Sequence, residues 1–129
     1  MKRSQIRSRY RSTGPSDEVV DLVLERAQYS CELDGAEMGY RRGVDYHVHH
    51  RRPRRMGGSQ LPDTNAPQNL LILCSDCHST VESERRAAYA GGWLVKQNMD
   101  PARVPVLIVA RSVFLTADGR YQDQPEGAS

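Results

Sequence analysis

Histidine and cysteine are confined to one stretch of this chain, and no other feature restricts its fold as strongly. The four histidines are His47, His49, His50 and His78, and the three cysteines are Cys31, Cys74 and Cys77. In a reducing compartment, cysteines that bracket histidines favour metal ligation over disulfides. A satisfied core position is the usual explanation for a lone histidine, but it fits a cluster of four poorly. We therefore expect a metal centre between residues 31 and 78.

The segment Cys74–Cys77 has two alternative interpretations. A redox Cys-x-x-Cys motif belongs in a thioredoxin-like βαβ pattern, and no such pattern surrounds this one. Cys77 beside His78 has the composition of a nucleophile with its base, but neighbours in sequence do not face each other on a helix. Both interpretations are weaker than metal ligation.

The chain is short and poor in aromatic residues. It has 129 residues, of which 6% are aromatic, with one Trp and one Phe. Such a chain folds around one thin core that a structural metal would help to stabilise, and multidomain or doubly wound folds are excluded. The longest apolar run, 104–110, contains Pro105 and is too short to span a bilayer, and the start of the chain lacks a signal-peptide stretch. We therefore expect a cytoplasmic protein.

Positive charge is concentrated in two segments, although the formal net charge is only +2. Residues 1–15 form a basic arm without any acid, and residues 41–55 contain six arginines against the single Asp45. The planar guanidinium binds phosphate with two hydrogen bonds, so a polyanion such as DNA is the expected partner. The alternative is that these arginines form a solvated surface.

Periodicity predicts a small mixed domain at 16–121, between the flexible arm 1–15 and a disordered tail 122–129. We expect a helix capped by Ser16 and running to about Gln28, and a strand over 44–49 that places His47 and His49 on one face. A long loop follows to Pro67. The later elements are expected to be an apolar segment at 69–73, a helix at 79–89, and strands at 93–95, 106–110 and 113–116.

Four spaced phrases carry a family resemblance. They are HHRRPRRMGGS from residue 49, QNLLILC from residue 68, CH at residue 77 and GWLV from residue 92. Their order and spacing resemble the HNH endonucleases, and together the phrases are similar to the small HNH nucleases of tailed bacteriophages. The resemblance covers residues 20–110. It implies an α+β fold with a ββα-metal, treble-clef-like core, an N-terminal helix and a small C-terminal sheet.

The resemblance assigns roles to individual residues. His50 matches the general base that takes a proton from water, and Asn69 matches the residue that hydrogen-bonds across the ββ loop and aims that base. His49 and His78 match metal ligands, and Glu82 is a candidate third ligand because it faces the same way as His78 on the helix. Such ligands suit a transition ion or a water-rich Mg²⁺, so Mg, Mn, Ni and Zn are the candidates.

Relatives commonly bind a structural zinc through two Cys-x-x-Cys pairs. The second pair, Cys74 and Cys77, is intact here, whereas the first reads Cys31 and Asp34. Carboxylate is an acceptable zinc ligand, so we expect a structural zinc bound more weakly than by four thiolates. The alternative is that zinc has been lost and the thiols are buried as small apolar groups.

By resemblance, the chain is expected to be a metal-dependent DNA endonuclease, acting as a single chain or a weak dimer, with no membrane association. His47 is expected at the surface or facing the substrate. The arginines expected to contact DNA are Arg41, Arg42, Arg51, Arg52, Arg54 and Arg55. In a phage, the family further implies a role beside the large terminase in DNA packaging. The alternatives are a restriction or homing-like nuclease and a non-catalytic, zinc-stabilised DNA-binding module.

Overall fold

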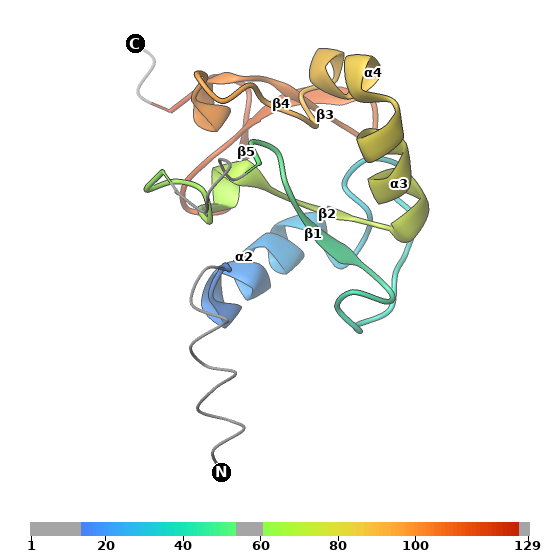
Figure 1. Ribbon diagram of the computed structural model, residues 1–129. Helices are drawn as coiled ribbons and strands as arrows, with labels where there is room; N and C mark the ends of the chain where they lie inside the picture. The colour runs from blue at the N-terminus through green and yellow to red at the C-terminus, as the bar shows by residue number, and fades with distance from the viewer. Residues whose placement is uncertain (1–13, 54–60, 127–129) are drawn as a thin grey trace, which may run out of the picture.

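The computed structural model of the protein describes residues 14–53 and 61–126. The predicted flexibility of the basic arm up to residue 13, the predicted DNA contacts of Arg54 and Arg55, and the last three residues of the tail lie outside the described residues. The described part is an α+β fold with two small antiparallel sheets (Figure 1). Its helices and strands are α2 (Asp17–Ala27), β1 (His47–His50), β2 (Leu70–Leu73), α3 (Ser75–Ser83), α4 (Arg85–Ala90), β3 (Val106–Ile108), β4 (Arg111–Leu115) and β5 (Tyr121–Gln122), with 3-10 turns η3 (Pro67–Asn69) and η4 (Pro101–Arg103).

The predicted N-terminal helix is confirmed as α2. The Ser16 hydroxyl accepts a hydrogen bond from the Val19 amide, which satisfies one of the free N–H groups at the helix start. The buried side of α2 carries Val20, Val23 and Leu24, which pack in one apolar cluster with Leu70 and Ile72 of β2.

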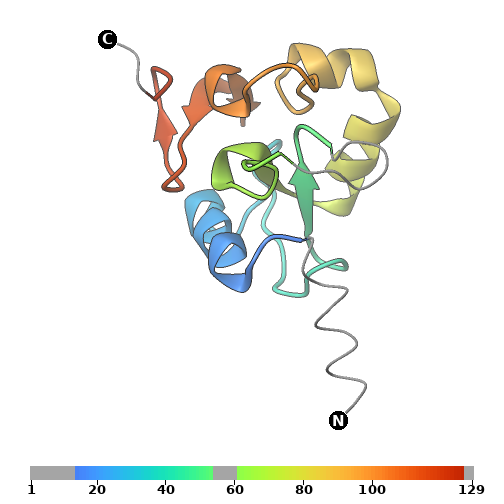
Figure 2. The ribbon, with the colours of Figure 1, turned by 60° about the vertical axis from the view of Figure 1, so that its left-hand side comes forward.

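The hairpin of β1 and β2 separates two apolar clusters. Leu70 and Ile72 face α2, whereas Leu71 and Leu73 pack with residues of α3 and the C-terminal sheet. Figure 1 shows this hairpin between α2 below and the C-terminal sheet above, and Figure 2 shows the same elements turned by 60°. His49 pairs with Leu71, so its side chain points to the side of the hairpin where α3 lies.

Strand β1 is shorter than predicted. Its pairing with β2 begins at His47, and Val44 is 58% exposed instead of half-buried. Residues 41–46 form a turn in which the Asp45 amide donates to the Arg41 main-chain oxygen. The alternation of apolar and polar side chains over residues 44–46 therefore does not correspond to a strand paired with β2. The placement of His47 and His49 on one face is as predicted, because both rings lie against His78.

The predicted helix over 79–89 is two helices, α3 and α4, joined at Glu84. Helix α3 begins earlier than expected because the Cys74 sulfur accepts a hydrogen bond from the Cys77 amide and caps the helix. Cysteine is not a common N-cap residue, so the sequence gives no signal for this start. His78 and Glu82 lie one turn apart on α3, as predicted.

The C-terminal sheet differs from the prediction at both of its ends. Residues 93–95 form no strand, and Val109 and Ala110 form the turn between β3 and β4, with positive φ at both residues. The expected tail is ordered as far as the structure describes it. Gln122 pairs with Phe114 in β5, and the Glu126 carboxylate accepts a hydrogen bond from the Ala117 amide.

Buried ionic contacts attach this sheet to the core. Arg26 of α2 forms a two-pronged ion pair with Glu32, and the Tyr121 hydroxyl donates to the same carboxylate at 2.6 Å. Glu32 also accepts a hydrogen bond from the Ile72 amide, so one carboxylate joins α2, β2 and β5. In the described ranges, every helix is too short or too polar to cross a membrane.

Candidate active site and zinc centre

Three predicted ligands of a catalytic ion converge beside the hairpin. His49 comes from β1, and His78 and Glu82 come from α3. One ligand atom of each lies within 4.8 Å of the others, and His49 Nδ1 is 4.0 Å from a Glu82 carboxylate oxygen. Two imidazole nitrogens and one carboxylate form a donor set that suits a divalent transition ion with positions left for water or phosphate. The residues present therefore fit such an ion.

The tautomer of His49 is determined by a main-chain group. Its Nε2 lies 2.7 Å from the Trp93 carbonyl oxygen, which can only accept, so Nε2 carries the hydrogen and Nδ1 keeps its lone pair. Burial lowers the pKa of this imidazole to about 4, and the neighbouring His78, His50 and Arg51 act in the same direction. The ring is therefore neutral near pH 7, with Nδ1 facing Glu82, as metal ligation requires.

His78 lies between two other imidazoles. Its ring stacks on His47 with the centroids 5.0 Å apart, and it meets the His49 ring edge-on at 5.4 Å. Burial lowers the pKa of His78, and the proximity of His47 adds to this effect. His47 itself is half-buried and forms a 2.9 Å hydrogen bond with the Ser75 hydroxyl, so it lies at the edge of the ligand group.

The predicted base, His50, opens onto the same cavity as the ligands. This cavity has a volume of about 270 Å³ and is lined by Val48, His49, His50, Pro53, His78, Glu82 and Arg85. The His50 Nε2 donates to the Asn65 amide oxygen at 2.9 Å. The candidate base, the candidate ligands and an arginine therefore share one open space of a size that admits a phosphate group.

Asn69 makes the hydrogen bonds across the loop that the resemblance implies. Its side chain is fully buried; the oxygen accepts from the Arg52 amide at 2.8 Å, and the nitrogen donates to the main-chain oxygens of Arg52 and Thr64. These bonds connect the chain just after His50 to the chain just before β2. Asn69 therefore fixes the main chain that carries His50 without facing the cavity.

Arg51 and Arg52 do not lie where a phosphate could reach them, which contradicts the DNA contacts predicted for them. Arg51 is fully buried, and its guanidinium donates to the main-chain oxygens of four residues: Gly92, Gln68, Pro101 and Val104. Arg52 is buried as well and binds the Asp63 carboxylate and the Met99 carbonyl. Charge alone suggested phosphate binding, but these side chains cross-link loops instead.

The other described arginines of that segment are exposed. Arg41 forms an ion pair with Asp45, and Arg42 lies beside it on the turn before β1. The turn is accessible to a polyanion, although it does not line the cavity that holds His50.

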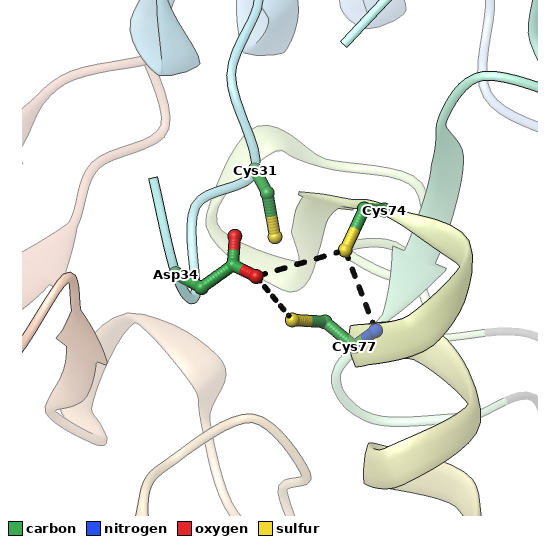
Figure 3. A group of neighbouring side chains, drawn as sticks. All are labelled: Cys31, Asp34, Cys74 and Cys77. Atoms are coloured by element: carbon green, nitrogen blue, oxygen red, sulfur yellow. Dashed lines mark hydrogen bonds between the residues drawn. The ribbon is translucent and has the colours of Figure 1, made fainter. Parts of the chain in front are cut away.

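A second group of candidate ligands lies at the start of α3. Cys31 comes from the segment after α2, Asp34 from the turn that follows it, and Cys74 and Cys77 from the helix cap; the four side chains point toward one another (Figure 3). An Asp34 oxygen is 3.3 Å from the Cys77 sulfur and 3.9 Å from the Cys74 sulfur. Zn–S bonds of about 2.3 Å in a tetrahedral site separate neighbouring sulfurs by about 3.8 Å. The spacing and chemistry of these donors fit zinc.

Without a metal, the thiols of Cys31 and Cys77 are poor acids. Burial is the main cause that raises the pKa of Cys31 and Cys77, and the nearby Asp34 carboxylate adds to the effect at Cys77. A hydrogen bond from the Ala36 amide lowers the pKa of Asp34, so the carboxylate is ionised. A metal at this position therefore has to displace thiol protons.

A hairpin followed by a helix, with candidate metal ligands on both and a candidate base at the end of the first strand, is the arrangement of a ββα-metal centre. In agreement, residues 31–84 match the model of the family described as HNH endonuclease. Residues 31–84 are therefore similar to an HNH endonuclease domain. Comparison with curated proteins and with solved structures found no match for the chain.

Several residues at the site were not identified from the sequence. The Trp93 group that contacts His49 is a main-chain carbonyl, and Asn65 is one polar residue in a polar loop, so neither carries a distinct signal. Arg85 follows the last candidate ligand, Glu82, by three residues. Extending the helical spacing of His78 and Glu82 by one turn could have found it.

Proposed function

We propose that this protein is a metal-dependent DNA endonuclease in which His50 is the general base and His49, His78 and Glu82 hold the catalytic ion. One observation carries the proposal: donor atoms of the three ligands lie within 4.8 Å of one another, in a cavity that His50 also lines. The HNH family match of residues 31–84 supports the same class of reaction.

The residues account for the chemistry of phosphodiester hydrolysis. A neutral His50 imidazole takes a proton from water as the water attacks phosphorus, and the Asn65 oxygen stabilises the imidazolium that forms. Asn69 hydrogen-bonds to the main chain of Arg52, just after His50, and of Thr64, and so holds these two segments together. A divalent ion, when bound, supplies positive charge for the non-bridging and departing oxygens. His49 contributes a lone pair whose direction the Trp93 carbonyl maintains.

We further propose that Cys31, Asp34, Cys74 and Cys77 bind a structural zinc. The support is their convergence and the small size of the apolar clusters around them. Such a zinc would join the segment after α2 to the first turn of α3, the helix that carries His78 and Glu82. The zinc would therefore stabilise the position of the catalytic helix.

The biological role is proposed from resemblance. The phrases shared with small HNH nucleases of tailed phages support a nuclease that cuts concatemeric DNA beside a large terminase in the host cytoplasm. DNA is the substrate in this proposal. A restriction-type nuclease would use the same described site.

A plasmid-nicking assay tests the proposed reaction. Purified protein is incubated with supercoiled DNA and Mg²⁺, Mn²⁺, Ni²⁺ or Zn²⁺, and His50→Ala is compared with wild type. We expect cleavage with at least one ion and a loss of about 10²-fold or more in His50→Ala, as is usual when a general base is removed. Equal cleavage by both proteins would refute the assignment of the base.

The assay also separates the proposal from the non-catalytic alternative. Titration of His49→Ala with Mn²⁺ or Ni²⁺ should show weaker binding than wild type, whereas His50→Ala should bind normally. DNA binding without cleavage under any ion would favour a zinc-stabilised DNA-binding module instead.

A further inference from the structure

We propose that Arg85, Tyr89 and Lys96 form a phosphate-binding edge of the active site that holds the cleaved DNA strand. We call these three residues the Arg85–Lys96 edge. The inference rests on the proposed nuclease function, and it identifies which cations replace the buried Arg51 and Arg52 as phosphate contacts.

Among the described residues, Arg85 is the arginine that lines the cavity. It is the first residue of α4, it is exposed, and it borders the 270 Å³ space together with His50, His78 and Glu82. Within the described ranges it takes part in no ion pair, since its polar contact is a 3.5 Å hydrogen bond to the Tyr89 hydroxyl. Its guanidinium can therefore donate to both non-bridging oxygens of a phosphate in the cavity.

Tyr89 lies near two cations. The Arg85 guanidinium lies 5.8 Å from the centre of the Tyr89 ring, and the Lys96 ammonium lies 5.9 Å from the same centre. The ring is partly buried against the apolar cluster below it, so it is a fixed support for both side chains. Cation–π attraction offsets part of the repulsion between the two positive charges, and a bound phosphate would offset the rest.

Lys96 is anchored to the chain that follows the base. The amide of its neighbour Val95 donates to the Arg51 carbonyl, and the Gln97 side chain donates to the Pro53 carbonyl at 2.6 Å. Pro53 lines the same cavity as Arg85. Lys96 is exposed and, in the described part of the chain, forms no ion pair. Arg85 is thus placed for the phosphate in the cavity and Lys96 for a neighbouring phosphate of the same strand.

The test compares three substitutions with the same charge change: Arg85→Gln, Lys96→Gln and Arg86→Gln. Arg86 is the control, because it is exposed on the same helix but does not line the cavity. DNA affinity is measured at several salt concentrations in a His50→Ala background. Each lost phosphate contact should reduce the slope of log affinity against log salt by about 0.9. We expect this reduction for Arg85→Gln and Lys96→Gln, and no change for Arg86→Gln.

Cleavage rates at saturating DNA provide the second measurement. In the catalytically active background, Arg85→Gln should lower kcat by about 10²-fold, as loss of a donor to a developing charge does. Lys96→Gln should cause a smaller loss than Arg85→Gln, and the three variants should share the melting temperature of wild type. Equal salt slopes for all three variants, or for Arg85→Gln and wild type, would overturn the proposal.

Failure of the proposed nuclease function can be distinguished from failure of the Arg85–Lys96 edge. If the protein binds DNA but never cleaves it, the salt slopes still decide whether the edge contacts phosphate. If it cleaves DNA while the slopes of Arg85→Gln and Arg86→Gln agree, the nuclease proposal survives and the Arg85–Lys96 edge is wrong.

Discussion

The Nε2 of His49 on β1 lies 2.7 Å from the main-chain oxygen of Trp93, a residue that the chain reaches only after α4. Two further contacts hold the same segment: Arg51 donates to the Gly92 carbonyl, and the Val95 amide donates to the Arg51 carbonyl. The segment that follows α4 therefore sets the tautomer of a candidate ligand on β1. The ββα centre is completed by main chain from outside the motif.

The pH dependence of stability should reveal the neutral state of His49. Its pKa is about 4 in the fold and about 6.5 in an unfolded chain, so protonation favours unfolding. The stability that the neutral His49 contributes to the fold is fully present above pH 6.5 and is lost as the pH falls toward 4. The total loss is on the order of 3 kcal/mol, at 1.36 kcal/mol per pKa unit.

The measurement is urea unfolding of wild type and His49→Gln between pH 7.5 and pH 4.5, both with chelator. Chelation removes any zinc equally from the two proteins, so their difference isolates His49. A constant difference across this range would show that His49 titrates normally in the fold.

Asn69→Ala should destabilise the protein strongly. The substitution leaves the buried Arg52 amide and the buried Thr64 carbonyl without their Asn69 partner, and each such group costs about 1–3 kcal/mol. We expect a loss of about 2–4 kcal/mol in the free energy of unfolding, measured by urea titration. A loss below 1 kcal/mol would mean that the loop does not depend on this side chain.

Asn65 should act on the reaction rather than on the fold. Asn65→Asp places a carboxylate beside His50 in place of the amide, and this charge should raise the pKa of the imidazole. We therefore expect the acid limb of the kcat profile to shift to higher pH, with a melting temperature close to that of wild type. An unshifted profile in Asn65→Asp would indicate that Asn65 does not contact the base during catalysis.

Local patterns predicted the elements that depend on nearby residues. The Ser16 cap and the apolar spacing gave α2 almost to its last residue, and the spacing of His78 and Glu82 gave one face of α3. The sequence failed where tertiary contacts decide the outcome. Residues 93–95 have strand composition, but their main-chain groups bind His49 and Arg51 instead of a neighbouring strand.

At the candidate site, too, tertiary contacts that the sequence does not reveal decide what each arginine does. Arg51 and Arg85 look alike in the sequence, since both are cations close to a predicted catalytic residue. Only the fold shows that four carbonyl groups enclose Arg51 while Arg85 faces the cavity. Charge density predicts a polyanion partner, but burial decides which cations can contact it.

Arg51→Met should therefore cause a folding defect instead of a binding defect. Burial lowers the pKa of this guanidinium to about 9, and its removal takes a hydrogen-bond donor away from four main-chain carbonyl groups. The expected loss is about 3–5 kcal/mol. Urea unfolding measures it, with exposed Arg42→Met as the matched control. A stable Arg51→Met protein with weakened DNA binding would restore the phosphate role that the sequence predicted.

Asp34 should determine how tightly the chain retains zinc. Asp34→Cys gives four thiolates, which bind zinc more tightly than three thiolates and one carboxylate do, and Asp34→Ala leaves three ligands. We expect zinc retention during dialysis against a chelator, measured as metal per chain, to rise from Asp34→Ala through wild type to Asp34→Cys. The melting temperature should follow the same order, because bound metal stabilises only the folded chain. Glu37, an exposed carboxylate in the same loop, provides the control Glu37→Ala, which should match wild type. Substoichiometric zinc in wild type and in Asp34→Cys alike would mean that these thiols are simply buried side chains.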